Sequence, residues 1–314
     1  MMVAYIGLSR KNIMKRMVQR AVAVVAAITM LSALGACGVG QSANGSDEDA
    51  INVVASVNQW GTVAKALGGG DVNVTSIINS TNVEAHDYEP TTADIAKLQK
   101  AQVIVVNGAD YDSWAVKAAK STKANVVNAA EVSGKKSGDN PHVWFSTQVR
   151  EDTAKAITAA YKKAVPSKAD DFDKLYEQWQ SKENDLAKSI AKVKKTADGL
   201  TYAATESVAD YLASDLGLKD VTPTGYAQAT ANESEPTPTD IKQFTDTLES
   251  GKIKLLVVNT QEETDLTGKI TDAAKSANVP MVELTEQMPD KYDSLTAWME
   301  GLIDEFSAAI QQAG

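Results

Sequence analysis

The stretch KADDFDKLYEQWQSKENDLAKSIAKVKKTA at residues 168–197 decides the fold, because it separates two halves of a different character. It contains no glycine or proline. Its apolar residues recur mostly three, four or seven positions apart: Phe172, Leu175, Trp179, Leu186, Ile190 and Val193. This spacing predicts one amphipathic helix about 45 Å long, at about 1.5 Å per residue. The apolar repeat covers too few heptads for a stable coiled coil, so we expect a strut that runs along two lobes.

The two flanking halves alternate between strand-like and helix-like segments. Short β-branched runs at 51–57 and 103–106 are typical of parallel strands that are buried on both faces. The second half repeats the pattern, with strand-like runs at 202–205, 255–258 and 279–284. Helical spacing fills the intervals: 60–67, 92–100, 147–165, 208–216, 239–250, 264–277 and 294–312.

These patterns predict an α/β protein with two lobes, each built on a parallel sheet. We expect an N-terminal lobe at 51–166, a linking helix at 167–198 and a C-terminal lobe at 199–314. In such folds ligands bind at the carboxyl ends of parallel strands and between lobes. The cleft between the two lobes is therefore the expected binding site.

A secretory signal is expected at residues 1–36. Five basic residues precede a largely apolar run at 21–36, and no acid occurs before Asp47. The run is shorter than the ~20 residues of a spanning helix. It ends in LGAC at 34–37, which resembles the lipobox of bacterial lipoproteins, where the cysteine becomes the first mature residue and carries the lipid. We therefore expect lipidation at Cys37 and a flexible polar tether at 37–50, the alternative being an ordinary cleavage site beside an incidental cysteine.

The charge balance disfavours nucleic acid as a partner. The chain has 31 basic and 41 acidic residues, and five of the basic ones lie in the signal. The remaining chain carries 26 basic and 41 acidic residues, a net charge of −15. Nucleic-acid binding needs a basic footprint, whereas an acidic surface attracts cations. The single cysteine leaves no disulfide and no thiolate metal site in the folded part.

The chain has only two histidines, and they share a local pattern. His86 lies in AHDYEP at 85–90 and His142 in DNPHVW at 139–144, each with a proline nearby and an aromatic residue two positions later. A loop histidine by itself is usually only solvent-exposed. A pair with one pattern favours a metal site, because imidazole is the commonest nitrogen ligand and needs a further partner to fix its tautomer.

The segments EAHDYEP and NPHVWF resemble the two histidine motifs of the zinc/manganese-binding proteins of bacterial ABC importers (cluster A-I), usually D-P-H-x-Y-E-P and D-P-H-x-W. The resemblance runs from about residue 51 to the end and includes the long helix. It implies that two α/β lobes hold one divalent transition metal ion, Mn²⁺ or Zn²⁺, in their cleft as the transported ligand. It also implies a monomer without enzymatic activity, anchored by lipid to the outer face of the cell membrane, with an ABC permease subunit as partner.

The same resemblance implies the ligand set. His86 and His142 come from the two motifs, and Glu206 stands where the family has a histidine or glutamate after a strand. The other reading of Glu206 is a surface glutamate that opens a helix. Glu286, after the strand-like run VPMVEL, stands for an acid that follows a late strand. Three acids in another polar loop compete for this fourth position: Glu262, Glu263 and Asp265.

The implied donor set bears on the choice of metal. Two imidazoles and two carboxylates suit a harder ion such as Mn²⁺, whereas zinc prefers more nitrogen or sulfur, yet still binds such a set tightly. Many zinc-importing relatives carry a long loop rich in histidine and aspartate, where this chain has SGKKSGDN at 133–140. That departure favours manganese or a less selective role.

Three other functions remain open from the sequence. A secreted metal-dependent hydrolase would need three protein ligands and an open position for water, with Glu286 as base. No H-E-x-x-H, G-x-S-x-G, P-loop or G-x-G-x-x-G motif occurs. A receptor for an organic solute would usually need an arginine for a carboxylate, and Arg150 is the only arginine after the signal. A surface adhesin-type lipoprotein is not tested by any residue pattern.

Overall fold

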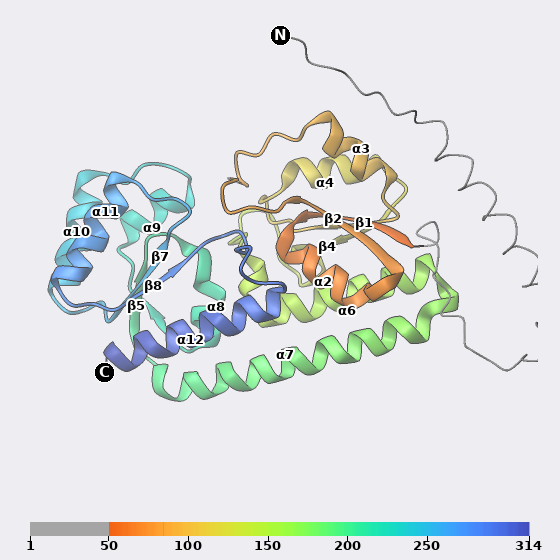
Figure 1. Ribbon diagram of the computed structural model, residues 1–314. Coiled ribbons are helices and arrows are strands. Elements are labelled where there is room, and N and C mark those ends of the chain that lie inside the picture. Colours follow the sequence, from red (N-terminus) through yellow and green to blue (C-terminus); the bar gives the residue numbers. More distant parts are fainter. Residues whose placement is uncertain (1–49, 84, 314) are drawn as a thin grey trace, which may run out of the picture. The chain divides into compact units, whose positions relative to one another are not determined.

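The computed structural model describes residues 50–83 and 85–313, and two parallel four-stranded sheets organise them (Figure 1). The expected signal at 1–36, the lipidated Cys37 and the tether up to residue 49 lie outside the described residues. Among the helices of the described part, none is long and apolar enough to cross a membrane.

The first sheet has the strand order β2-β1-β3-β4, with all pairs parallel. Its strands are β1 (Ile51–Val57), β2 (Val72–Ile78), β3 (Val103–Val106) and β4 (Asn125–Asn128). The helices of this half are α2 (Asn58–Gly68), α3 (Thr92–Lys100), α4 (Ser113–Ala119), α5 (Ala129–Val132) and α6 (Thr147–Ala164). The central strands β1 and β3 are almost wholly buried, as their β-branched runs predict for strands covered on both faces.

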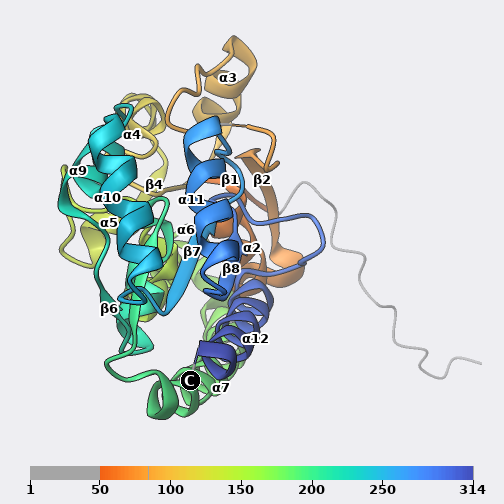
Figure 2. The ribbon, with the colours of Figure 1, turned by 90° about the vertical axis from the view of Figure 1, so that its left-hand side faces the viewer.

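The second sheet repeats this topology in the order β6-β5-β7-β8, again all parallel. Its strands are β5 (Thr201–Ala204), β6 (Lys219–Asp220), β7 (Leu255–Asn259) and β8 (Met281–Leu284). The helices that follow them are α8 (Asp210–Asp215), α9 (Thr224–Ala231), α10 (Pro238–Glu249), α11 (Asp265–Ser276) and α12 (Leu295–Ala313). In Figure 2, α10 and α11 lie side by side over one face of this sheet, where their apolar residues form a core with β7. The two-lobe α/β architecture is confirmed.

The long helix α7 (Ala169–Ala197) spans 29 residues and runs beneath both sheets (Figure 1). Its apolar stripe is buried at Phe172, Trp179, Leu186, Ile190 and Val193. These residues belong to one hydrophobic core that also includes residues of β1 and of β5. The helix is therefore a strut shared by the two lobes. The boundaries 51–166, 167–198 and 199–314 stay predictions, since α12 packs against α7 and α2 as well as against β8.

A buried ion pair joins three of these helices. Arg150 Nε of α6 lies 3.0 Å from Glu183 Oε2 of α7, and both side chains are 1% exposed. The hydroxyl of Thr296 in α12 donates to the other oxygen of Glu183 at 2.8 Å. The only arginine after residue 36 is thus engaged in holding the scaffold together. This leaves no guanidinium for a solute carboxylate.

The pattern of the sequence did not predict β2. Asn73 and Ser76 interrupt its apolar residues, and the strand lies at the edge of the sheet, where only part of each face is covered. The glycine-rich turn before it forms a short 3₁₀ segment, Gly69–Asp71, which connects α2 to β2. The pattern did not predict β6, α4, α5 or α9 either. The ends of the elements that it did predict differ from the observed ones by a few residues at most.

Candidate metal centre

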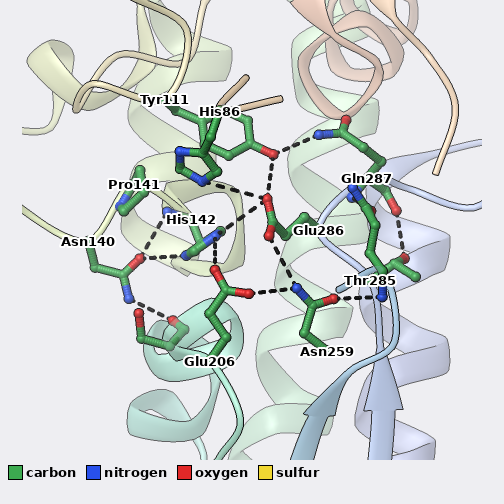
Figure 3. A network of polar contacts seen from close by, with 12 residues as sticks. His86, Tyr111, Asn140, Pro141, His142, Glu206, Asn259, Thr285, Glu286 and Gln287 are labelled. Carbon is green, nitrogen blue, oxygen red and sulfur yellow. Dashed lines mark hydrogen bonds and ion pairs between the residues drawn. The ribbon is translucent and has the colours of Figure 1, made fainter. Parts of the chain in front are cut away.

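Four side chains meet in the cleft between the lobes (Figure 3). His86 lies in the loop after β2 and His142 immediately before a 3₁₀ turn at Val143–Phe145. Glu206 follows β5, and Glu286 follows β8. Each offers one ligand atom, and these atoms lie within 4.8 Å of one another. The structure thus brings together, two from each lobe, the four residues that the sequence singled out.

The tautomer of His142 follows from its contact with Asn140. Asn140 Oδ1 accepts the backbone N–H of His142 at 3.0 Å, and Asn140 Nδ2 donates to the carbonyl of Ser207 at 2.7 Å. These two backbone partners fix which end of the amide faces the ring. The ring Nδ1, 2.9 Å from the same oxygen, therefore carries the proton. The neutral ring then presents the lone pair of Nε2 to Glu206 and Glu286, which is the form that binds metal.

Glu286 is fully buried and held by both lobes. The hydroxyl of Tyr111 donates to its Oε2 at 3.0 Å, and Asn259 Nδ2 donates to its Oε1 at 3.2 Å. Its backbone carbonyl accepts from Gln59 Nε2 at 2.7 Å. Since Gln59 and Tyr111 belong to the first lobe, the carboxylate of the second lobe is positioned by contacts that cross the cleft.

Glu206 shares the amide of Asn259 with Glu286. Asn259 Nδ2 lies 2.6 Å from Glu206 Oε2, so one amide nitrogen donates to both carboxylates. Burial, and next the charge of Glu286, raise the pKa of Glu206, while the nearby His142 and the amide of Asn259 lower it. Two buried carboxylates this close repel each other, and a cation between them relieves that repulsion.

The spacing of the ligand atoms suits a shared ion better than direct hydrogen bonds. His142 Nε2 lies 3.7 Å from Glu206 Oε1 and 3.7 Å from Glu286 Oε2. His86 Nε2 lies 3.8 Å from the same Glu286 oxygen. Hydrogen bonds between such atoms are at most about 3.2 Å long. Two donors that bind one tetrahedral ion at about 2.0–2.2 Å are about 3.4 Å apart, close to the observed separations.

The cleft outside the cluster is strongly acidic. It has a volume of about 890 Å³, and none of the described residues that line it is a lysine or an arginine. Beside Glu206 of the cluster, its lining includes seven acids: Asp87, Asp110, Asp139, Asp210, Glu233, Glu235 and Glu262. A concave surface with charges of one sign concentrates counter-ions and steers them inward. The entrance therefore favours cations over anionic solutes.

The competing acids lie outside the cluster. Glu262 lines the cleft but is exposed, and Glu263 and Asp265 are exposed as well. The sequence patterns could not distinguish these acids from Glu286. They also missed the polar residues Asn140 and Asn259, because nothing in the spacing shows which side chain an amide will face.

Comparisons with known proteins agree with this arrangement. The family model described as zinc-uptake complex component A, periplasmic (ZnuA), matches residues 53–309. The high-affinity zinc uptake system protein ZnuA of Bacillus subtilis is 29% identical over 63% of this chain and 68% of its own length. The manganese-binding lipoprotein MntA of the same organism is 24% identical over 77% of this chain and 81% of its own length.

Solved structures show the same fold. The periplasmic zinc binding protein TroA from Treponema pallidum superimposes with a TM-score of 0.71 and 19% identity, over 83% of this chain and 99% of that one. The chain spans only 56% to 62% of the length of three other curated relatives that it matches.

Proposed function

The chain belongs to the ZnuA family of periplasmic zinc-uptake components, and on that premise we propose that it captures one divalent transition metal ion outside the cell membrane and delivers it to an ABC permease. The observation that carries the proposal is the cluster of two imidazoles and two carboxylates at the bottom of an acidic cleft. The family is one of uptake components, so the hydrolase and adhesin readings are not retained.

We propose His86, His142, Glu206 and Glu286 as the four ligands of this ion. Their support is the mutual distance of the ligand atoms, the fixed tautomer of His142 and the two carboxylates that face its Nε2. Four protein ligands fill a tetrahedral shell, whereas catalytic zinc keeps one position open for water. The arrangement is suited to capture and release of the ion, with the metal as cargo.

The proposal is tested by titrating residues 50–314 with Mn²⁺ and Zn²⁺ after removal of metal. We expect one ion per chain and a thermal midpoint that rises with metal concentration, because the ion binds the folded state only. A chain that binds neither ion, or binds several with similar affinity, contradicts a single built site.

We propose Mn²⁺ or Zn²⁺ as the cargo, and the carboxylate Glu206 as the residue that shifts the balance towards Mn²⁺. Glu206→His creates a set of three nitrogens and one carboxylate, which is closer to the preferences of zinc. We expect the ratio of Zn²⁺ to Mn²⁺ affinity to rise at least about tenfold, or about 1.4 kcal/mol. Competitive titration at fixed pH measures it, since ligand protons are released on binding. If the ratio of Zn²⁺ to Mn²⁺ affinity does not change, either Glu206 does not bind the ion or the geometry of the site determines metal preference more than the type of ligand.

We also propose that Cys37 carries a lipid that anchors the extracytoplasmic chain, and that the chain acts as a monomer. The support for the anchor is the LGAC sequence at the end of the signal-like segment. Cys37→Ser is expected to release the processed protein from the membrane or leave it uncleaved, while metal binding by the folded domain persists. Cell fractionation with mass analysis of the N-terminus measures this. Membrane retention of a correctly processed Cys37→Ser protein contradicts the anchor.

A further inference from the structure

Helix α9 ends with a residue type that differs from those at the ends of α8, α10 and α11. Glu233 has a φ of 52°, in the left-handed region that favours glycine. Its N–H donates to the Thr230 carbonyl, and the N–H of Ser234 donates to the Ala229 carbonyl, both at 2.9 Å. These two bonds define a Schellman motif, in which glycine or asparagine normally occupies the left-handed position.

Other helices of the same lobe end in the expected way. Gly217 after α8, Gly251 after α10 and Asn278 after α11 take positive φ values at the equivalent position. Among these helix ends of the described part, only α9 places a long charged side chain there. An observed departure from the local preference indicates a role for that side chain beyond ending the helix.

The side chain of Glu233 reaches across the cleft to a proposed ligand. Its Oε1 lies 3.3 Å from Nδ1 of His86, and the Glu233 side chain, at the mouth of the cleft, is 71% exposed. Nε2 of the same ring points towards Glu286 Oε2 at 3.8 Å. A carboxylate beside Nδ1 favours the tautomer with the proton on that nitrogen, which leaves Nε2 as the metal-binding atom. His86 belongs to the first lobe and Glu233 to the second, so this contact joins the lobes directly above the cluster.

We propose that Glu233 is a positioning residue that holds His86 from the opposite lobe and thereby sets how fast the metal ion leaves the cleft. The proposal rests on the proposed function. His86 is partly exposed, whereas His142 is almost fully buried and already oriented by Asn140. The ring at the mouth also packs edge-on against Tyr111, with ring centroids 4.8 Å apart, and Glu233 is the group that faces its Nδ1 from the opposite lobe. When the lobes part at this contact, His86 loses the carboxylate beside its Nδ1, and the ion loses a well-placed ligand.

Glu233→Gly separates the two roles of this position, because it suits the backbone and removes the carboxylate. We expect the thermal midpoint of the metal-free protein to rise by about 2 °C, since glycine adopts the left-handed conformation without strain. We expect the affinity for Zn²⁺ to fall by about tenfold or more, mainly through faster dissociation into a chelator in stopped-flow measurements. Glu233→Gln keeps an oxygen that accepts from Nδ1–H and is expected to stay within about threefold of the original rate.

Glu235→Gln is the matched control, because it removes the same charge from the same loop at the mouth of the cleft. It is expected to change the dissociation rate by less than about twofold. The inference is overturned if Glu233→Gly releases Zn²⁺ at the original rate, or if Glu235→Gln accelerates release equally. Either result leaves the proposed function intact. Failure of the unaltered protein to bind Zn²⁺ instead contradicts the proposed function.

Discussion

We expect His142→Ala to weaken the binding of both Mn²⁺ and Zn²⁺ on the order of a hundredfold. A complete four-ligand zinc site is worth about 10–16 kcal/mol, so one ligand contributes about 3 kcal/mol, which corresponds to that factor. His142 is 2% exposed, its tautomer is fixed by Asn140, and its Nε2 faces both carboxylates. Isothermal titration with each ion measures the loss.

The buried ring also packs edge-on against Tyr111 and Trp144, with ring centroids 6.0 Å and 5.5 Å away, so its removal leaves a cavity. His86→Ala separates the loss of a ligand from this loss of packing, because the His86 side chain is 19% exposed. We expect His86→Ala to weaken binding similarly with a smaller drop in the thermal midpoint. Unchanged affinity in both variants, with intact circular dichroism, contradicts the proposed site.

Glu286→Gln is the second change with a large expected effect. The substitution keeps the size of the side chain and one oxygen, but removes the formal charge that balances a divalent ion. We expect both metals to bind on the order of a hundredfold more weakly, with little change in their ratio, because no softer donor is added. This outcome differs from that of Glu206→His, which is expected to change the ratio.

Glu263→Gln is the control for Glu286, since it removes the same charge from an exposed acid of the neighbouring loop. We expect it to leave both affinities within about twofold of the original. If Glu286→Gln has no effect while Glu263→Gln abolishes binding, the fourth ligand lies in the loop after β7. The buried position of Glu286 between Tyr111 and Asn259 favours Glu286, and not Glu263, as the fourth ligand.

The fold was largely predictable because its strongest signals are periodic. The apolar spacing of residues 168–197 predicted α7, and the β-branched runs at 51–57 and 103–106 predicted the central strands. Buried elements have to be apolar on every covered face, so they leave a clear pattern in the sequence. The edge strand β2, which mixes polar and apolar residues, left none.

The site was predictable only in part. The two histidines stand out because the chain has no others, but Glu206 and Glu286 were singled out through the resemblance to a family. Spacing alone treats Glu286 and the acids at 262–265 alike, since burial and cross-lobe contacts do not appear in a linear pattern. The roles of Asn140, Asn259 and Glu233 depend on side chains far apart in the sequence and on one backbone angle. Such features become visible only in the folded chain.

A crystal structure of residues 50–314 grown with Zn²⁺, with anomalous data at the zinc edge, tests the central claim most directly. We expect one strong peak in the cleft, about 2.0–2.2 Å from Nε2 of His86, Nε2 of His142 and one carboxylate oxygen each of Glu206 and Glu286. A zinc ion held instead by the acids at 262–265 contradicts the account. The account is also contradicted if the protein binds zinc in solution but the crystal shows no anomalous peak among these four side chains.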